Sequence, residues 1–442
     1  MLLEFKTINF KSFLNEAVFS MTPAPKQKGL DYSILCESFT GGSANALCSS
    51  VVYGPNASGK TNIIEAMDVL RAIILRGNIK NSDDTNQPNA SAFNLELIPN
   101  SSISTSKPVE FYIDFVENKI HFQYKIVLQL GNFLNKENAR EIIEEEFIVN
   151  GNKIFKRDNS LSVFVENIPE NFVNLYNSGE LNTIESIANS SLQSDELFLC
   201  NGFKLVCSQS LYKIILNWFE NKFMVICKAD SLQLINRFSD PQKKTIHINV
   251  ATQKAANLFG VESNLIGYIQ KEDSSDPKLV SILKNTNGNP HIAIPADIYE
   301  SYGTIRFINI FPLIVRAIMT GSTLIVDEFD ASIHPMALMN IINIFHNDDI
   351  NKHHAQLIFN THNPIFLNSN ILRRDEIKFV ERDTNQQSSI YTLADFGTSG
   401  SAGVRKNEDY LKNYFISKYG AIKDIDFTPV FEEILRKNEE NK

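Results

Sequence analysis

A glycine-rich segment at residues 54–61 has residue types and spacing suited to holding phosphate. It follows the pattern glycine, any four residues, glycine, lysine, threonine. In such a loop the second glycine, here Gly59, lets the backbone wrap closely, and N–H groups at a helix N-terminus face the phosphates. The Lys60 ammonium would neutralise the β- and γ-phosphate oxygens, and the Thr61 hydroxyl would ligate Mg²⁺. The predicted nucleotide-binding residues of this segment are Gly54, Asn56, Ala57, Ser58, Gly59, Lys60, Thr61 and Asn62.

Two adjacent carboxylates, Asp327 and Glu328, follow the apolar run at residues 324–326. Ligands of open α/β sheets bind at the C-terminal ends of strands, so this is a Walker B arrangement. We predict that Thr61 and Asp327 hold Mg²⁺ and that Glu328 orients or deprotonates the attacking water. On its own, such a pair is more often a solvated strand end, but a phosphate loop in the same chain favours the catalytic interpretation.

A histidine, His362, follows another mainly apolar run at residues 355–359. A lone histidine usually sits at the surface or in the core with a local hydrogen bond. Because neighbouring parallel strands end at the same edge of a sheet, we predict that His362 reaches the γ-phosphate as a second catalytic residue.

The elements that must position these groups can be read from hydrophobic periodicity. The apolar run at 46–53 predicts a strand entering the phosphate loop, and apolar residues three and four apart over 63–74 predict a helix leaving it. Alternating residues at 109–115 and 120–126 predict a β-hairpin.

Towards the C-terminus predicted helices and strands alternate, which favours a mainly parallel sheet. The predicted elements are a core helix at 307–319, a strand at 323–326, a helix at 335–345 and a strand at 355–359.

The middle of the sequence contains no motif that indicates a chemical function. Charged residues at 138–146 and the run 211–226, which contains Trp218, predict helices, and polar breaks separate such stretches without a fixed period. We interpret this part as an inserted lobe.

The amino-acid composition excludes several classes of protein. The 442 residues carry 42 basic and 51 acidic side chains, a net charge of −9, which argues against coating nucleic acid by bulk charge. Five cysteines without a CxxC pair predict reduced thiols and argue against a zinc or disulfide framework. The N-terminus lacks the apolar core of a signal peptide, and Asn309 and Pro312 interrupt the most apolar stretch. We therefore expect a cytoplasmic protein without a membrane segment.

Several segments together resemble the head of an ABC-type ATPase. They are GPNASGKTN, ESYGT (300–304), LIVDEFDASIHP (324–335) and IFNTHNP (358–364). More narrowly they are similar to the prokaryotic AAA-fifteen group, related to OLD, SMC, RloA, PARIS and Septu-type ATPases. INFKSF (8–13), RRDEIKFVER (373–382) and SKYGAIKD (417–424) extend the resemblance, which covers about residues 1–130 and 290–425.

The resemblance implies an α/β fold: an ABC-type head with a mixed β-sheet core, an N-terminal antiparallel β region and an inserted, mainly helical lobe. The implied domains are the N-terminal part of the head (1–135), the lobe (136–290) and the C-terminal part of the head (291–442).

The same resemblance implies a site shared between two chains. Ser301 and Gly303 would form a degenerate signature motif that binds ATP held by another copy. Residues 329–333 would be the D-loop, and His362 the switch histidine. Tyr302 and Thr304 stand where a transporter would carry glycine and glutamine, which argues against transport. Neither Gln87 nor Gln123 is assigned as the Q-loop glutamine, and adenine contacts are expected near Lys11 and Phe13.

These features predict an ATP hydrolase that uses ATP and Mg²⁺ and works as an ATP-sandwich homodimer or a larger oligomer. The first hypothesis is a sensor or regulatory subunit of a bacterial anti-phage, abortive-infection system. Its effector, such as a TOPRIM or HNH nuclease, would be encoded separately. The alternative is an SMC-like DNA-repair head that binds nucleic acid through its inserted lobe. No membrane partner is expected.

Overall fold

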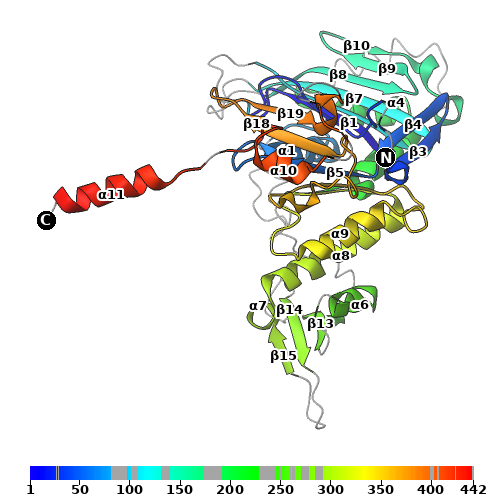
Figure 1. Ribbon diagram of the computed structural model, residues 1–442. Coiled ribbons are helices and arrows are strands. Elements are labelled where there is room, and N and C mark those ends of the chain that lie inside the picture. Colours follow the sequence, from blue (N-terminus) through cyan, green and yellow to red (C-terminus); the bar gives the residue numbers. More distant parts are fainter. Residues whose placement is uncertain are drawn as a thin grey trace.

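The computed structural model describes residues 1–25, 27, 29–80, 97–100, 107–130, 140–173, 192–227, 245–247, 250–258, 260, 264–269, 278–283, 292–398, 403–405, 408–423 and 425–440. The described strands form a seven-stranded, a six-stranded and a four-stranded sheet and a two-stranded hairpin of β3 (Ile34–Phe39) and β4 (Gly42–Leu47) (Figure 1). Helices pack on a sheet of mixed strand direction, so the predicted α/β class is confirmed.

The six-stranded sheet carries the predicted motifs. Its strands, in spatial order, are β11 (Phe223–Ile226), β16 (Thr323–Val326), β17 (Gln356–Asn360), β5 (Ser49–Tyr53), β18 (Ile377–Arg382) and β19 (Ser388–Thr392). All neighbours pair in parallel except β18 and β19. Strands β5, β16 and β17 are buried throughout, as expected for a parallel sheet covered on both faces.

Alternate residues of β5 enter two hydrophobic cores. Val52 packs into the core shared by α1 (Lys60–Arg76) and the seven-stranded sheet, whereas Val51 and Tyr53 pack into a second core. The second core is closed by α8 (Tyr302–Thr320), α9 (Pro335–Phe345) and α10 (Tyr410–Phe415). The sheet is therefore sandwiched between α1 and these helices, which confirms the helices predicted at 63–74, 307–319 and 335–345.

The seven-stranded sheet is antiparallel. Its strands, in spatial order, are β10 (Leu161–Val163), β9 (Asn152–Arg157), β8 (Glu141–Val149), β7 (Ile120–Gln129), β6 (Val109–Glu117), β1 (Leu2–Ile8) and β2 (Ala17–Ser20). Strands β6 and β7 form the predicted hairpin, turning at Asn118 and Lys119, which both have positive φ.

The helix predicted at residues 138–146 is wrong, because residues 141–149 form β8. Its glutamates favoured a helix, but buried apolar residues alternate with them, and pairing with β7 and β9 decides the conformation. Glu145 is buried there and accepts hydrogen bonds from the Phe198 and Leu199 amides and from the Tyr124 hydroxyl.

The helix predicted over 211–226 is only partly correct. The structure has α5 (Gln209–Asn217), then a π-helical turn (Trp218–Lys222), and then β11, which joins the six-stranded sheet beside β16. The four apolar residues of β11, of which Phe223 and Met224 are buried, pair in parallel with β16, and this tertiary pairing ends the helix.

Residues 136–290, predicted as one inserted lobe, contribute strands to three different sheets. Strands β8 to β11 belong to the two large sheets, whereas β12 (Thr245–His247), β13 (Asn264–Ile269), β14 (Lys278–Leu283) and β15 (Ile292–Pro295) form a separate sheet. That sheet lies beside α6 (Val250–Leu258) and α7 (Ala296–Tyr299), on the side of α8 away from the two large sheets (Figure 1). The described residues of this range are therefore richer in strand than the mainly helical lobe predicted.

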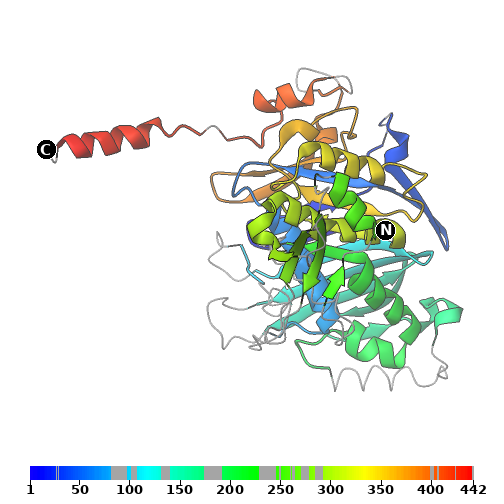
Figure 2. The ribbon, with the colours of Figure 1, turned by 90° about the horizontal axis from the view of Figure 1, so that it is seen from below.

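Two helices stand out by their surroundings. Among the described residues, α8 is the one helix long and apolar enough to cross a membrane by length and composition, and half of its apolar window is buried in the protein. Helix α11 (Thr428–Glu440) instead projects from the head in both views (Figures 1 and 2), and residues 425–437 are all exposed.

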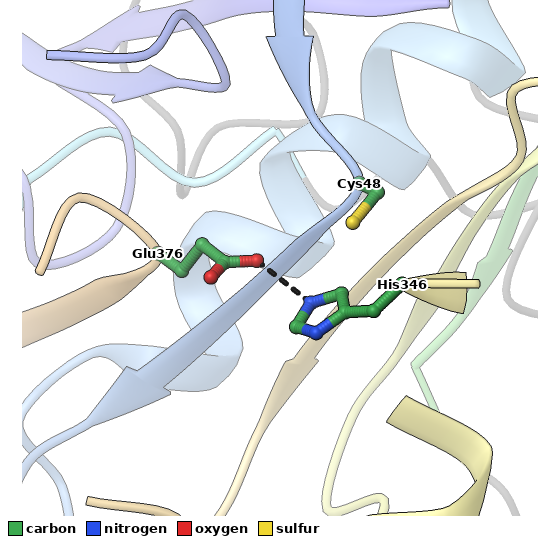
Figure 3. A group of neighbouring side chains, drawn as sticks. All are labelled: Cys48, His346 and Glu376. Atoms are coloured by element: carbon green, nitrogen blue, oxygen red, sulfur yellow. Dashed lines mark hydrogen bonds and ion pairs between the residues drawn. The ribbon is translucent and has the colours of Figure 1, made fainter. Parts of the chain in front are cut away.

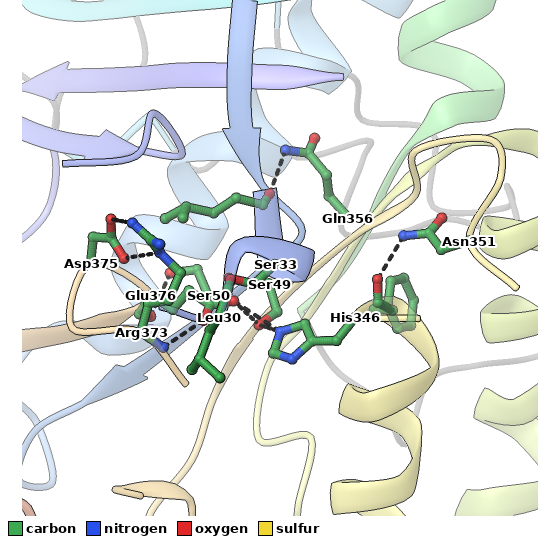
Figure 4. Close-up of polar contacts among 12 residues, drawn as sticks. Leu30, Ser33, Ser49, Ser50, His346, Asn351, Gln356, Arg373, Asp375 and Glu376 are labelled. Atoms are coloured by element: carbon green, nitrogen blue, oxygen red, sulfur yellow. Dashed lines mark hydrogen bonds and ion pairs between the residues drawn. The ribbon is translucent and has the colours of Figure 1, made fainter. Parts of the chain in front are cut away.

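A buried polar cluster lies where β5 and β18 begin. Figure 3 shows Cys48, His346 and Glu376, whose possible ligand atoms all lie within 4.8 Å of one another. Hydrogen bonds occupy both Glu376 oxygens: Oε1 accepts from Ser49 Oγ (2.7 Å) and from His346 Nε2 (2.9 Å), and Oε2 accepts from the Arg373 amide (2.7 Å) (Figure 4). Burial raises the pKa of the Cys48 thiol. The cluster therefore ties the α9 terminus to the start of two strands.

Candidate nucleotide-binding site

The phosphate loop connects β5 to α1, as predicted. Gly59 is the N-cap of α1 with φ 111°, and a Cβ there would lie 2.6 Å from the hydroxyl oxygens of Ser12 and Ser388. Only glycine fits such a conformation at such close approach. The Ser388 hydroxyl also donates to the Ser58 carbonyl, and Asn62 Nδ2 donates to Ser12 Oγ at 2.7 Å. Side chains from outside the motif thus hold the loop in shape.

Lys60 is the buried cation of the loop. Its Nζ donates to the carbonyls of Gly54 (2.8 Å) and Pro55 (2.9 Å). Burial lowers the pKa of Lys60 to about 8, although the carboxylates of Asp327 and Glu328 act to raise it. Backbone carbonyls therefore hold the ammonium at the mouth of the loop, where phosphate oxygens could replace them as its partners.

Two oxygen donors suited to Mg²⁺ meet across the sheet edge. Thr61 Oγ1 lies 3.1 Å from Asp327 Oδ1 and 3.2 Å from Oδ2. Asn360, at the end of β17, donates to the Asp327 carboxylate. Burial raises the pKa of Asp327 to about 6, while the bonds from Asn360 and Thr61 act to lower it. A hydroxyl beside a desolvated carboxylate fits a small hard cation.

Glu328 is held by its backbone and leaves its side chain exposed. Its φ is 47°, in the left-handed region. Its amide donates to Asn360 Oδ1, and its carbonyl accepts from the guanidinium of Arg306. The fixed peptide directs the carboxylate to the cavity beside the phosphate loop.

That cavity gathers the predicted residues. It has a volume of about 320 Å³, and its lining comprises Asn56, Ala57, Ser58, Gly59, Lys60, Thr61, Asn62, Glu328, Asn360, His362 and Arg382. Burial and the nearby Lys60 ammonium lower the pKa of His362, so its imidazole is neutral near pH 7. The parallel order of β16, β17 and β5 brings the three motifs together, as the shared-edge argument predicted.

Ser301 and Gly303 do not line this cavity. Ser301 is the N-cap of α8, and its Oγ accepts from the Thr304 amide at 3.1 Å. Gly303 packs against the turn after Glu328, because a Cβ there would lie 2.0 Å from the Ser332 carbonyl oxygen. Their predicted contact with ATP on another copy stays a prediction.

Sequence reasoning assigned no role to three residues at the site: Asn360, Arg306 and Arg382. Asn360 could have been predicted from the sequence, because it is a polar residue at the end of an otherwise apolar strand. Arg306 was visible only as a charge directly before the apolar helix predicted at 307–319. Arg382, which donates to the Ala57 carbonyl at 3.2 Å, had no signal before the pairing of β18 with β5 was known.

The residues expected near adenine and the two unassigned glutamines are not among the described residues that line the cavity. Phe13 is fully buried in the core, and Lys11 pairs with Glu65 at 2.7 Å, so neither lines the cavity. Gln123 bonds to Asp114 in the antiparallel sheet. Gln87 lies outside the described residues.

The sequence matches the family described as "AAA domain, putative AbiEii toxin, Type IV TA system" over residues 49–173 and 223–368. These segments make up more than half of the chain and contain the phosphate loop, Asp327 and Glu328. The chain therefore belongs to this family, and its class is an ATPase of the ABC/AAA type. No curated protein has a sequence that matches it.

Solved structures give more distant similarity. The SMC head domain from Thermotoga maritima is 13% identical, with a TM-score of 0.37, and the alignment covers 88% of this chain and 98% of that one. The SmcHead bound to the C-winged helix domain of ScpA is 12% identical, with a TM-score of 0.36 and coverage of 88% and 97%.

Proposed function

We propose that the chain hydrolyses ATP with Mg²⁺ and acts as the ATP-driven sensor or regulatory subunit of an anti-phage, abortive-infection system with a separately encoded effector. One observation carries the catalytic part: Lys60, the pair of Thr61 and Asp327, and Glu328 meet at one cavity edge. Family membership supplies the class, and this arrangement supplies a role for each group.

We assign the roles from the chemistry of the side chains and their positions around the cavity. Lys60 and the N-terminus of α1 bind the phosphates, while Thr61 and Asp327 would hold Mg²⁺. When bound, the ion neutralises charge on the phosphate oxygens. Glu328, whose backbone is fixed, accepts a proton from the attacking water, and neutral His362 donates a hydrogen bond to the γ-phosphate.

Phosphate release by purified wild type and Glu328→Gln tests the catalytic part. We expect steady release by wild type in Mg²⁺ and a fall of about 100-fold or more in the variant, because removal of a general base costs about 10²–10⁴-fold. Glu433→Gln, on the exposed face of α11, is the control and should match wild type. Equal rates for wild type and Glu328→Gln would refute the assignment of Glu328.

The defence role rests on the family. Its description names an AbiEii toxin and a type IV TA system, which supports a function in abortive infection. Within that proposal, the chain belongs to the AAA-fifteen group, works in the cytoplasm, and forms an ATP-sandwich homodimer or a larger oligomer that controls a TOPRIM or HNH nuclease.

Affinity capture from cells that express Glu328→Gln with its neighbouring genes tests the partner. We expect one neighbouring gene product with nuclease motifs to be retained in ATP and released in ADP. Binding of duplex DNA that requires ATP and weakens with salt, without such a partner, would instead favour the alternative DNA-repair head.

A further inference from the structure

Arg306 joins the first turns of α8 to the Walker B turn. Its side chain is 6% exposed, and its Nη2 donates to the Glu328 carbonyl and more weakly, at 3.4 Å, to the Asp327 carbonyl. Asn360 holds the Glu328 amide from the other side. The peptide that carries the proposed catalytic carboxylate is therefore fixed by one group from β17 and one from α8.

A second contact joins the same two segments. Gly303 approaches the Ser332 carbonyl so closely that no Cβ would fit, and Ser332 itself has φ 61°. A displacement of the α8 N-terminus must therefore move the 328–332 turn, because packed groups at van der Waals contact transmit displacement.

The N-terminus of α8 also has a side chain that can change partners. Ser301 Oγ accepts from the Thr304 amide and lies 2.9 Å from Thr304 Oγ1. Its neighbour Glu300 accepts from Ser281 Oγ of β14 at 2.6 Å, which links this end of α8 to the small sheet. A phosphate at the helix N-terminus would compete for these donors and shift the first turn.

We propose that Arg306 is a positioning residue that couples ligand engagement at the α8 N-terminus to the placement of Glu328 in the same chain. The coupling rests on the proposed function, in which Ser301 contacts ATP held by a second copy. Each copy's signature segment then sets its own Glu328, so hydrolysis at the two sites is cooperative.

Arg306→Lys tests the coupling, because lysine keeps the charge but is one atom shorter, so its ammonium cannot take the position of Nη2 beside the two carbonyls. We expect kcat to fall by about 10- to 100-fold while KM changes by less than about 3-fold, since a misplaced catalytic group affects the transition state more than binding. The Hill coefficient for ATP should fall from above 1 in wild type to 1. Arg316→Lys, on the same helix with a bond to Asn221, is the matched control and should change neither value.

Hydrogen exchange without nucleotide gives a readout that does not need turnover. Arg306→Lys should speed exchange in residues 328–333, and Arg316→Lys should not; Arg306→Gln, which keeps one donor, replaces it if the lysine variant fails to fold. Unchanged exchange, an unchanged kcat, or a wild-type Hill coefficient of 1 would overturn the coupling. A wild type that releases no phosphate contradicts the proposed function instead, and the exchange comparison then still decides whether Arg306 holds the turn.

Discussion

Lys60 and Asp327 sit in surroundings that oppose the charges needed for binding a metal-bound nucleotide. Burial lowers the pKa of Lys60 to about 8 and raises that of Asp327 to about 6. Both charged forms are therefore less favourable in the folded chain than in water. Phosphate would stabilise the ammonium, and a divalent cation would stabilise the carboxylate. The cost of burying the two charges is therefore present without ligand and is offset when ligand binds.

Asp327→Asn should stabilise the nucleotide-free protein at pH 7.5. The folded pKa of Asp327, about 6, lies above its ordinary 3.8, so the folded state binds this proton more tightly than the unfolded state. The contribution of Asp327 to stability is therefore greatest below about pH 4 and is lost as the pH rises through about 6. Urea unfolding should show a gain of about 3 kcal/mol at pH 7.5 that disappears near pH 4.

A loss of stability in Asp327→Asn at pH 7.5 would contradict this account. It would mean that the hydrogen bonds from Thr61 and Asn360 to the carboxylate outweigh its burial.

Nucleotide binding at pH 8.5 should be accompanied by proton uptake. Lys60, with a pKa of about 8, is mostly neutral there, and phosphate raises its pKa, so we expect uptake of about three quarters of a proton. Calorimetry in two buffers of different ionisation enthalpy measures this uptake. Lys60→Arg, which carries a permanent charge, is the control and should show none from this position. Equal uptake in both proteins would exclude Lys60 as its source.

At the scale of elements, the polar cluster at the start of β5 and β18 should contribute more to stability than a surface ion pair. Glu376→Ala leaves buried donors of Ser49, His346 and Arg373 without their acceptor, which should cost about 3 kcal/mol in the free energy of unfolding. Glu433→Ala, which removes an exposed ion pair with Lys437, should cost less than about 0.5 kcal/mol. If chemical denaturation gives similar losses of unfolding free energy for Glu376→Ala and Glu433→Ala, the cluster does not contribute more than a surface ion pair.

Removal of residues 425–442 should leave the head intact. Residues 425–437 of this segment are exposed along their whole length, so their loss removes no core packing. The melting temperature of the shortened chain should lie within about 1 °C of wild type by calorimetry. A drop of several degrees would mean that α11 rests on the head in solution.

Local pattern was sufficient for most elements of the site. The strand entering the phosphate loop, α1, β16, α9 and β17 were predicted within a few residues, because each is apolar with a single period and ends at a clear break. The prediction at 138–146 failed because glutamate runs favour helices in isolation, while cross-strand pairing with β7 is invisible in the local sequence. Residues 223–226 likewise became a strand only because β16 offers them an edge.

At the scale of the whole molecule, the order of strands in the six-stranded sheet determines which residues meet at the site, and the sequence alone could not predict that order. Strand β17 lies between β16 and β5, which places Asn360 between Asp327 and the phosphate loop. The sequence predicted that these strand ends share an edge, but their order, and so the central position of Asn360, depends on contacts between distant segments. The same holds for Arg306, whose contact with Glu328 joins two elements that each looked self-contained.

The most direct test of the ATP-sandwich proposal is the mass of Glu328→Gln in solution, measured by light scattering with and without Mg²⁺ and ATP. If two copies close on two nucleotides that cannot be hydrolysed, the mass should change from one chain, 50.0 kDa, to twice that value on addition of ATP. ADP should leave it at one chain. A mass that ignores ATP at millimolar Mg²⁺, in a protein that still binds nucleotide, would contradict the closed dimer and with it the roles given to Ser301 and Gly303.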